Sequence, residues 1–161
     1  MIIRMLALTL ACAAVPAMVS AQSVEIVFTP AVTQQALALK GALKVDKVDA
    51  FNALALVGAS PERRKAYADK VAGDTAVVII GEDALKAASA IAFSLPVIVI
   101  NATGATAATG RVIRVFDTTS EAAGRATAAT AATAKNLIGG ATPALKGDVG
   151  LLVQAVLLAL K

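Results

Sequence analysis

The sequence contains 161 residues, 58% of them hydrophobic, and its 15 basic and 11 acidic residues give a net charge of +4. The lack of histidine and the single cysteine exclude an internal disulfide, a Cys/His zinc site and Ser-His-Asp hydrolysis, so we expect no catalytic residue, metal or cofactor. The basic residues are dispersed except for a cluster at residues 63–65, which suits a solvated helix face better than a partner-binding patch. Aromatic residues make up only 3%, too few for the stacking surface of a nucleic-acid partner.

The first 21 residues have the three parts of a secretory signal. Arg4 precedes an apolar region over residues 5–15, and the small residues at 19–21 suit a cleavage site. A membrane anchor would need about 20 apolar residues, and a lipoprotein acylated at Cys12 would have a very short apolar region before that cysteine. We therefore predict a cleaved signal, a periplasmic location and one domain over residues 22–161.

The first part of the domain is predicted to form a strand, a helix and a strand. Residues 24–28 are the first strand, and residues 32–44 are a helix with apolar residues at the four-three-four spacing of one buried stripe. Residues 51–57 are the candidate for the second strand, although alanine and leucine suit a helix equally well there.

A second helix is predicted to begin at Ser60. Serine can cap the free backbone amides, Pro61 fits the first helical position, and Glu62 faces the positive end of the helix dipole. Tyr67 and Val71 lie four residues apart, and we expect them to anchor this helix on the sheet.

Residues 74–101 form the clearest β-α-β unit of the chain. Residues 77–80 and 97–100 are apolar at every position, as expected of parallel strands that are covered on both faces. Between them, residues 82–93 are predicted to form a helix that packs closely on the sheet, because its polar strip is narrow.

Residues 101–110 are nearly all small, and we predict a mobile loop there. Residues 111–116 follow as a further strand, in which Arg114 indicates one wet face and a position at the edge of the sheet. The direction of this strand stays open, because ten loop residues barely suffice for a parallel crossover.

Two more helices are predicted in the remaining sequence. Thr118 and Glu121 have the spacing of a capping box at the start of an alanine- and threonine-rich helix that ends near residues 139–140. Residues 148–161 form a helix that is apolar nearly all round, so it packs either on its own domain or on a partner chain, as in a homodimer.

This alternation of strands and helices predicts an α/β fold, with a three-layer, open and mainly parallel sheet that has helices on both faces, as in Rossmann-like domains. Ligands of such sheets bind beyond the carboxyl ends of the strands. The candidate ligand-binding residues are therefore Thr29, Thr33, Ser60, Gly81, Glu82, Asn101, Thr103 and Asp117. Each of them also fits a role as a cap or turn residue.

Residues 77–101, with the sequence VVIIGEDALKAASAIAFSLPVIVIN, resemble a characteristic segment of the periplasmic substrate-binding proteins of ABC transporters, which have the type I periplasmic-binding fold. The resemblance implies an exported solute-binding or sensing module rather than an enzyme, with a small-molecule solute and a membrane transporter as its partners. That family encloses its ligand between two lobes, and residues 22–161 suffice for one, which implies a single-lobe or truncated form. Glu82 and Asp83 stand where the family commonly has a small hydroxyl residue, and two carboxylates there disfavour an anionic ligand.

Two alternatives remain open. The first is a structural or accessory periplasmic protein derived from one binding lobe, which would form a stable dimer and respond to no solute. The second is an enzyme in which Glu82, Asp83 and Asp117 perform acid-base chemistry through separated pKa values. Acids at helix starts more often serve as partners of the helix dipole, which favours a binding function over catalysis.

Overall fold

Six parallel strands form one sheet in the computed structural model, which describes residues 21–117 and 145–161. The strand order is β2-β1-β3-β4-β5-β6, and each neighbouring pair is parallel. The strands are β1 (Ser23–Phe28), β2 (Lys47–Asn52), β3 (Ala76–Ile80), β4 (Val97–Ile100), β5 (Val112–Asp117) and β6 (Leu145–Gly147). The order reverses between β1 and β3, and such a reversal creates a crevice at the carboxyl ends of the strands.

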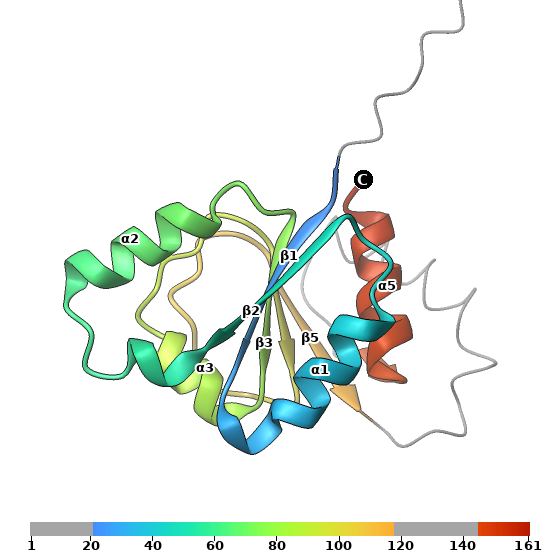
Figure 1. The fold of residues 1–161 in the computed structure, drawn as a ribbon, viewed down its shortest axis with the longest axis horizontal. Helices are drawn as coiled ribbons and strands as arrows, with labels where there is room; N and C mark the ends of the chain where they lie inside the picture. The colour runs from blue at the N-terminus through green and yellow to red at the C-terminus, as the bar shows by residue number, and fades with distance from the viewer. Residues whose placement is uncertain (1–20, 118–144) are drawn as a thin grey trace, which may run out of the picture.

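Helices cover both faces of this sheet, which confirms the predicted three-layer α/β fold. Helices α1 (Thr33–Ala42) and α5 (Val149–Ala159) lie on one side, and α2 (Pro61–Val71) and α3 (Glu82–Ala88) lie on the other (Figure 1). Two short 3-10 helices, η1 (Pro30–Val32) and η2 (Ala53–Leu56), follow β1 and β2. No helix in the described part of the chain is both long and apolar enough to cross a membrane.

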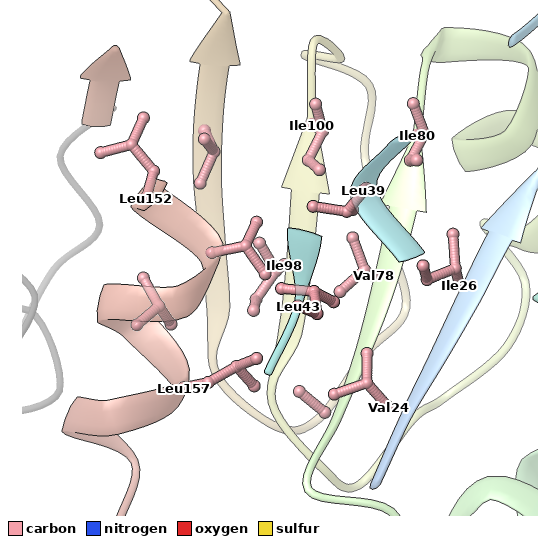
Figure 2. Close-up of a cluster of buried hydrophobic side chains, with 14 of the residues drawn as sticks. Val24, Ile26, Leu39, Leu43, Val78, Ile80, Ile98, Ile100, Leu152 and Leu157 are labelled. Carbon is pink, nitrogen blue, oxygen red and sulfur yellow. The ribbon is translucent and has the colours of Figure 1, made fainter. Parts of the chain in front are cut away.

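The face under α1 and α5 is filled by aliphatic side chains. Leu39 and Leu43 at α1, with Leu152 and Leu157 from α5, pack over the isoleucines and valines of the central strands (Figure 2). The apolar α5 is therefore buried in its own domain, which is one of the two outcomes that the sequence left open. Leu152 and Val156 both belong to this core.

The opposite face combines aliphatic residues with a group of aromatic rings. Tyr67 of α2 stacks on Phe51 of β2 with 4.3 Å between ring centroids, and it meets Phe93 edge-on at 6.3 Å. Val71 is also buried here, so both predicted anchors of α2 are confirmed. The predicted cap is confirmed too, because the Ser60 hydroxyl accepts a hydrogen bond from the Arg63 amide at 3.4 Å.

The predicted second strand at 51–57 was wrong in its position. The strand β2 lies at Lys47–Asn52, and the alanine and leucine residues that follow form the 3-10 helix η2. The side chain of Asn52 accepts a hydrogen bond from the Leu54 amide at 3.0 Å, which caps this short helix and ends the strand.

The helix predicted over 82–93 was too long, because α3 ends at Ala88. The Ser89 hydroxyl donates to the Lys86 carbonyl at 2.8 Å, and the chain then leaves the helical path. Ile91 and Phe93 are buried beyond the helix end, so the apolar pattern that suggested a longer helix reflects a buried connection.

The strand predicted at 111–116 is present as β5, but it is not at the edge of the sheet, because β6 pairs with it. The strand β6 was not predicted, since three residues carry no readable period. Of the signal predicted over residues 1–21, all but the last residue lies outside the described part of the chain, and so does the helix predicted to begin at Thr118.

Candidate functional site

The eight predicted ligand-binding residues follow strands that all run in the same direction, but they do not form one site. Three of them have roles in helix caps and turns instead. Ser60 caps α2, and the Thr33 hydroxyl donates to the Pro30 carbonyl at 2.9 Å. Gly81 has a φ of 84° in the turn from β3 into α3, a conformation that favours glycine over other residues.

Glu82 and Thr103 tie the 101–110 loop to α3. The two carboxylate oxygens of Glu82 accept hydrogen bonds from the amides of Thr103 at 2.9 Å and Gly104 at 3.0 Å. A Cβ atom at residue 104 would clash with the Glu82 carboxylate, so a larger residue there would displace this side chain from its two hydrogen bonds. Arg114 donates to the carbonyls of Ala102 at 2.9 Å and Gly104 at 2.8 Å, so this loop, which we predicted to be mobile, is held from both sides.

Asn101 and Asp117, at the carboxyl ends of β4 and β5, line a cavity of about 230 Å³ between α1 and the start of α5. We call it the α1–α5 cavity. Its lining residues are Gln35, Ala38, Leu39, Ala42, Ile80, Ile100, Asn101, Asp117, Asp148, Val149 and Gly150. Apart from Gln35, the wall is aliphatic along α1, and the other polar side chains come from the ends of β4 and β5 and from the start of α5.

The polar side of the α1–α5 cavity is held in place by hydrogen bonds to the backbone. Asn101, with an unusual φ of 52°, accepts a hydrogen bond from the Asp117 amide at 2.8 Å through its side-chain oxygen. This bond leaves the amide nitrogen of Asn101 as a donor. Asp148 caps α5 by accepting from the Leu151 amide at 3.0 Å, which engages one of its two oxygens.

The charges around the α1–α5 cavity favour a cation. Asp117 and Asp148 contribute two carboxylates, and none of the lining residues in the described part of the chain is basic. The amino end of α5 contributes the opposite field, equivalent to roughly half a positive charge. Both carboxylates are exposed and partly screened by water, but together they still outweigh that half charge, so the described residues make the field in the cavity negative.

A second cavity, of about 610 Å³, lies on the other face beside η2, and we call it the η2 cavity. Thr29, at the end of β1, is the predicted residue that lines it. The full lining is Thr29, Pro30, Ala31, Leu54, Leu56, Val57, Gly58, Arg64, Asp83, Lys86 and Ala87. The acidic group proposed for catalysis is therefore dispersed, with Glu82 on the loop amides, Asp83 at this cavity and Asp117 at the other.

Sequence reasoning missed Asp148 and Gln35 of the α1–α5 cavity. Asp148 precedes the last helix as a cap residue, but it reaches the carboxyl edge only because β6 joins the sheet. Gln35 lies in the first turn of α1 and carried no motif. Nowhere in residues 21–117 and 145–161 do three acidic, histidine or cysteine side chains gather in a way that would hold a metal ion.

A buried carboxylate lies away from both cavity linings. Glu25 of β1 is 1% exposed, accepts a hydrogen bond from the Tyr67 hydroxyl at 3.1 Å, and has Lys70 Nζ at 3.7 Å. Burial raises the pKa of Glu25 above its ordinary value, although the positive charge of Lys70 opposes the rise. Burial and the neighbouring Glu25 carboxylate also raise the pKa of the Tyr67 hydroxyl.

Comparisons with protein-family models, with curated proteins and with solved structures found no match to this chain.

Proposed function

We propose that this chain is a solute-binding module that holds a small cationic solute, such as a primary amine with a short alkyl chain, in the α1–α5 cavity. The observation that carries the proposal is the pair of carboxylates, Asp117 and Asp148, in a cavity whose described lining residues include no basic side chain. Export through the N-terminal signal would bring the module to the periplasm, where it would serve a membrane transporter.

The polar groups of the cavity suit an ammonium group. An ammonium ion has three donors and no acceptor, and both carboxylates can accept from it. Asp148 has one oxygen engaged at the start of α5, which leaves its other oxygen for a ligand. Hydrogen bonds to charged groups contribute about 1.5–3 kcal/mol each, which suffices to select an amine over an alcohol of the same shape.

The remaining lining sets the size and the apolar part of the solute. Leu39, Ile80 and Ile100 provide an aliphatic wall beside the carboxylates. The volume of about 230 Å³ lies below the roughly 300–1,000 Å³ of pockets that hold drug-sized ligands. A solute with a few carbon atoms and one charged end therefore fits better than a larger or uncharged one.

Calorimetric titration with a series of primary amines and amino acids tests this function. We expect saturable binding of short alkylamines, weakened roughly ten- to hundredfold in Asp117→Asn, because the neutral amide removes one charged acceptor. Asp69→Asn is the matched control, since this exposed carboxylate pairs with Lys65 on α2 and lines neither the α1–α5 nor the η2 cavity. Absence of amine binding, or equal affinity of the wild type and Asp117→Asn, would contradict the proposal.

A further inference from the structure

The η2 cavity has the opposite chemistry to the α1–α5 cavity. Arg64 of α2 and Lys86 of α3 place two positive charges on its wall, against one negative charge from Asp83. It lies near the reversal of strand order, because Thr29 and Pro30 directly follow β1 and Asp83 belongs to the helix that follows β3. In open α/β sheets this crevice is the usual place for a ligand.

Arg64 is the unexplained group at this cavity. Its Nε atom is buried and has no hydrogen-bond partner in the described part of the chain, and none of the ion pairs found there includes Arg64. Its neighbour Arg63 is exposed on the outer face of α2, where water satisfies a guanidinium. No described carboxylate forms an ion pair with the half-buried Arg64 guanidinium. Its Nε atom is closed off from solvent, so a carboxylate in the cavity would pair with the two terminal nitrogens, whose planar fork it matches.

Exposed apolar side chains lie beside these charges. Leu54 is 53% exposed and Val57 is 64% exposed, and both line the cavity with the buried Leu56. Pro30, Ala31 and Ala87 complete an apolar wall. Such a surface gains free energy when a hydrocarbon chain covers it.

We propose that the η2 cavity is a second binding site, which takes a monocarboxylate with a short apolar tail. The carboxylate pairs with the Arg64 guanidinium, and Lys86 adds a second positive charge. The tail lies along Leu54 and Val57. The site is separate from the α1–α5 cavity, because the two linings share no residue.

The net charge of the lining decides between an anion and a cation. Arg64 is held half-buried, whereas Asp83 is exposed and its charge is screened by water. The charge of Arg64 is therefore screened less than the charge of Asp83, and the exposed Lys86 adds a second positive charge. A carboxylate is favoured over an ammonium group at this cavity, which reverses the preference of the α1–α5 cavity.

Calorimetric titration with acetate, butanoate and hexanoate tests the charge and the tail together. We expect the affinity to rise roughly two- to fourfold for each added methylene, because the tail covers apolar surface. Hexylamine and hexanol should bind this site at least tenfold more weakly than hexanoate, because neither has a group that the Arg64 fork matches. Equal binding of hexanol and hexanoate would overturn the assignment of the charged end.

Two pairs of variants locate the ligand. Arg64→Gln should weaken hexanoate binding roughly tenfold or more, and Arg63→Gln should leave it unchanged, because only Arg64 lines the cavity. Val57→Ser should weaken hexanoate but not acetate, whereas Leu158→Ser changes a similarly exposed residue of α5 and should affect neither. Should Arg64→Gln fail to fold, Lys86→Gln replaces it, since Lys86 is exposed on α3. Hexanoate affinity that none of the cavity variants alters would overturn the proposal.

Discussion

The two faces of the sheet differ in how they treat charge. Under α1 and α5, the buried core is aliphatic, and two carboxylates line the α1–α5 cavity at the carboxyl edge. Under α2 and α3, a carboxylate is buried within the sheet beside a tyrosine, and the cavity at the edge is basic. The first face resembles an ordinary core, while the second holds an ionisable group where desolvation is expensive.

This difference predicts that the two faces contribute differently to how the stability of the protein depends on pH. On the aliphatic face, stability depends on packing, which does not change with pH. On the aromatic face, part of the stability depends on whether Glu25 carries its proton. The two faces also differ in what packs on β5, because α5 covers it on one face and the 101–110 loop covers it on the other.

The largest expected effect comes from the aliphatic face. Leu157→Ala should lower the free energy of unfolding by about 2–5 kcal/mol, because the side chain is fully buried and leaves a cavity. Leu158→Ala is the matched control, since that neighbour is 52% exposed and should change stability by no more than about 0.5 kcal/mol. Urea unfolding measures both, and equal losses would show that α5 does not pack as described.

Tyr67→Phe should give the next largest effect, on the aromatic face. The substitution removes the hydroxyl that donates to buried Glu25 at 3.1 Å and leaves the ring packing intact. A buried acceptor that loses its partner costs about 1–3 kcal/mol. A double-mutant cycle with Glu25→Gln measures the coupling, and additivity of the two substitutions would rule out the described contact.

Glu25→Gln should change how stability depends on pH. The pKa of Glu25 is raised above its ordinary value of 4.5, so the folded protein keeps a proton that the unfolded chain has released in the interval between the two values. The contribution of protonated Glu25 to the free energy of unfolding is therefore full below pH 4.5. It is lost as the pH rises through the raised pKa, by at most about 1.4 kcal/mol per pH unit.

The variant should lack this loss, so its stability relative to the wild type should increase with pH. The groups that act on Glu25 are Tyr67 and Lys70 from α2, Asp49 from β2, and Asp74 before β3. They remain in the variant, which makes it a direct control for their titration. Parallel unfolding curves for the two proteins between pH 4 and pH 8 would contradict the raised pKa.

The smallest expected effect concerns the 101–110 loop. Glu82→Gln replaces a carboxylate that accepts from two backbone amides with a group that has one acceptor oxygen, which should cost about 0.5–1.5 kcal/mol. Hydrogen exchange at the amides of Thr103 and Gly104 should become faster. Asp83→Asn, at the next position, is the control and should leave both amides unchanged.

The sequence predicted the fold from its most regular parts. Fully apolar strands at 77–80 and 97–100 and the cap at Ser60 have local causes, and all three are present in the structure. The boundaries that were wrong depend on contacts that are distant or that compete with the local pattern. Arg114 indicated an edge strand, but its guanidinium is satisfied by loop carbonyls 10 and 12 residues away in sequence.

The candidate sites were harder to predict for the same reason. Parallel strands place all their carboxyl ends at one edge, so the edge could be predicted without the structure. The division into an acidic and a basic cavity depends on which face each following helix takes, and on Asp148, which arrives through β6. Arg64 gave no signal, because in the sequence it is one member of a basic cluster on a helix.

The most direct test of two oppositely charged sites in one domain is a crossed calorimetric titration with butylamine and hexanoate on the wild type, Asp117→Asn and Arg64→Gln. We predict that the wild type binds both ligands, that neither displaces the other, and that each variant loses affinity only for the ligand of its own cavity. Competition between the two ligands, or a variant that weakens both equally, would contradict the account.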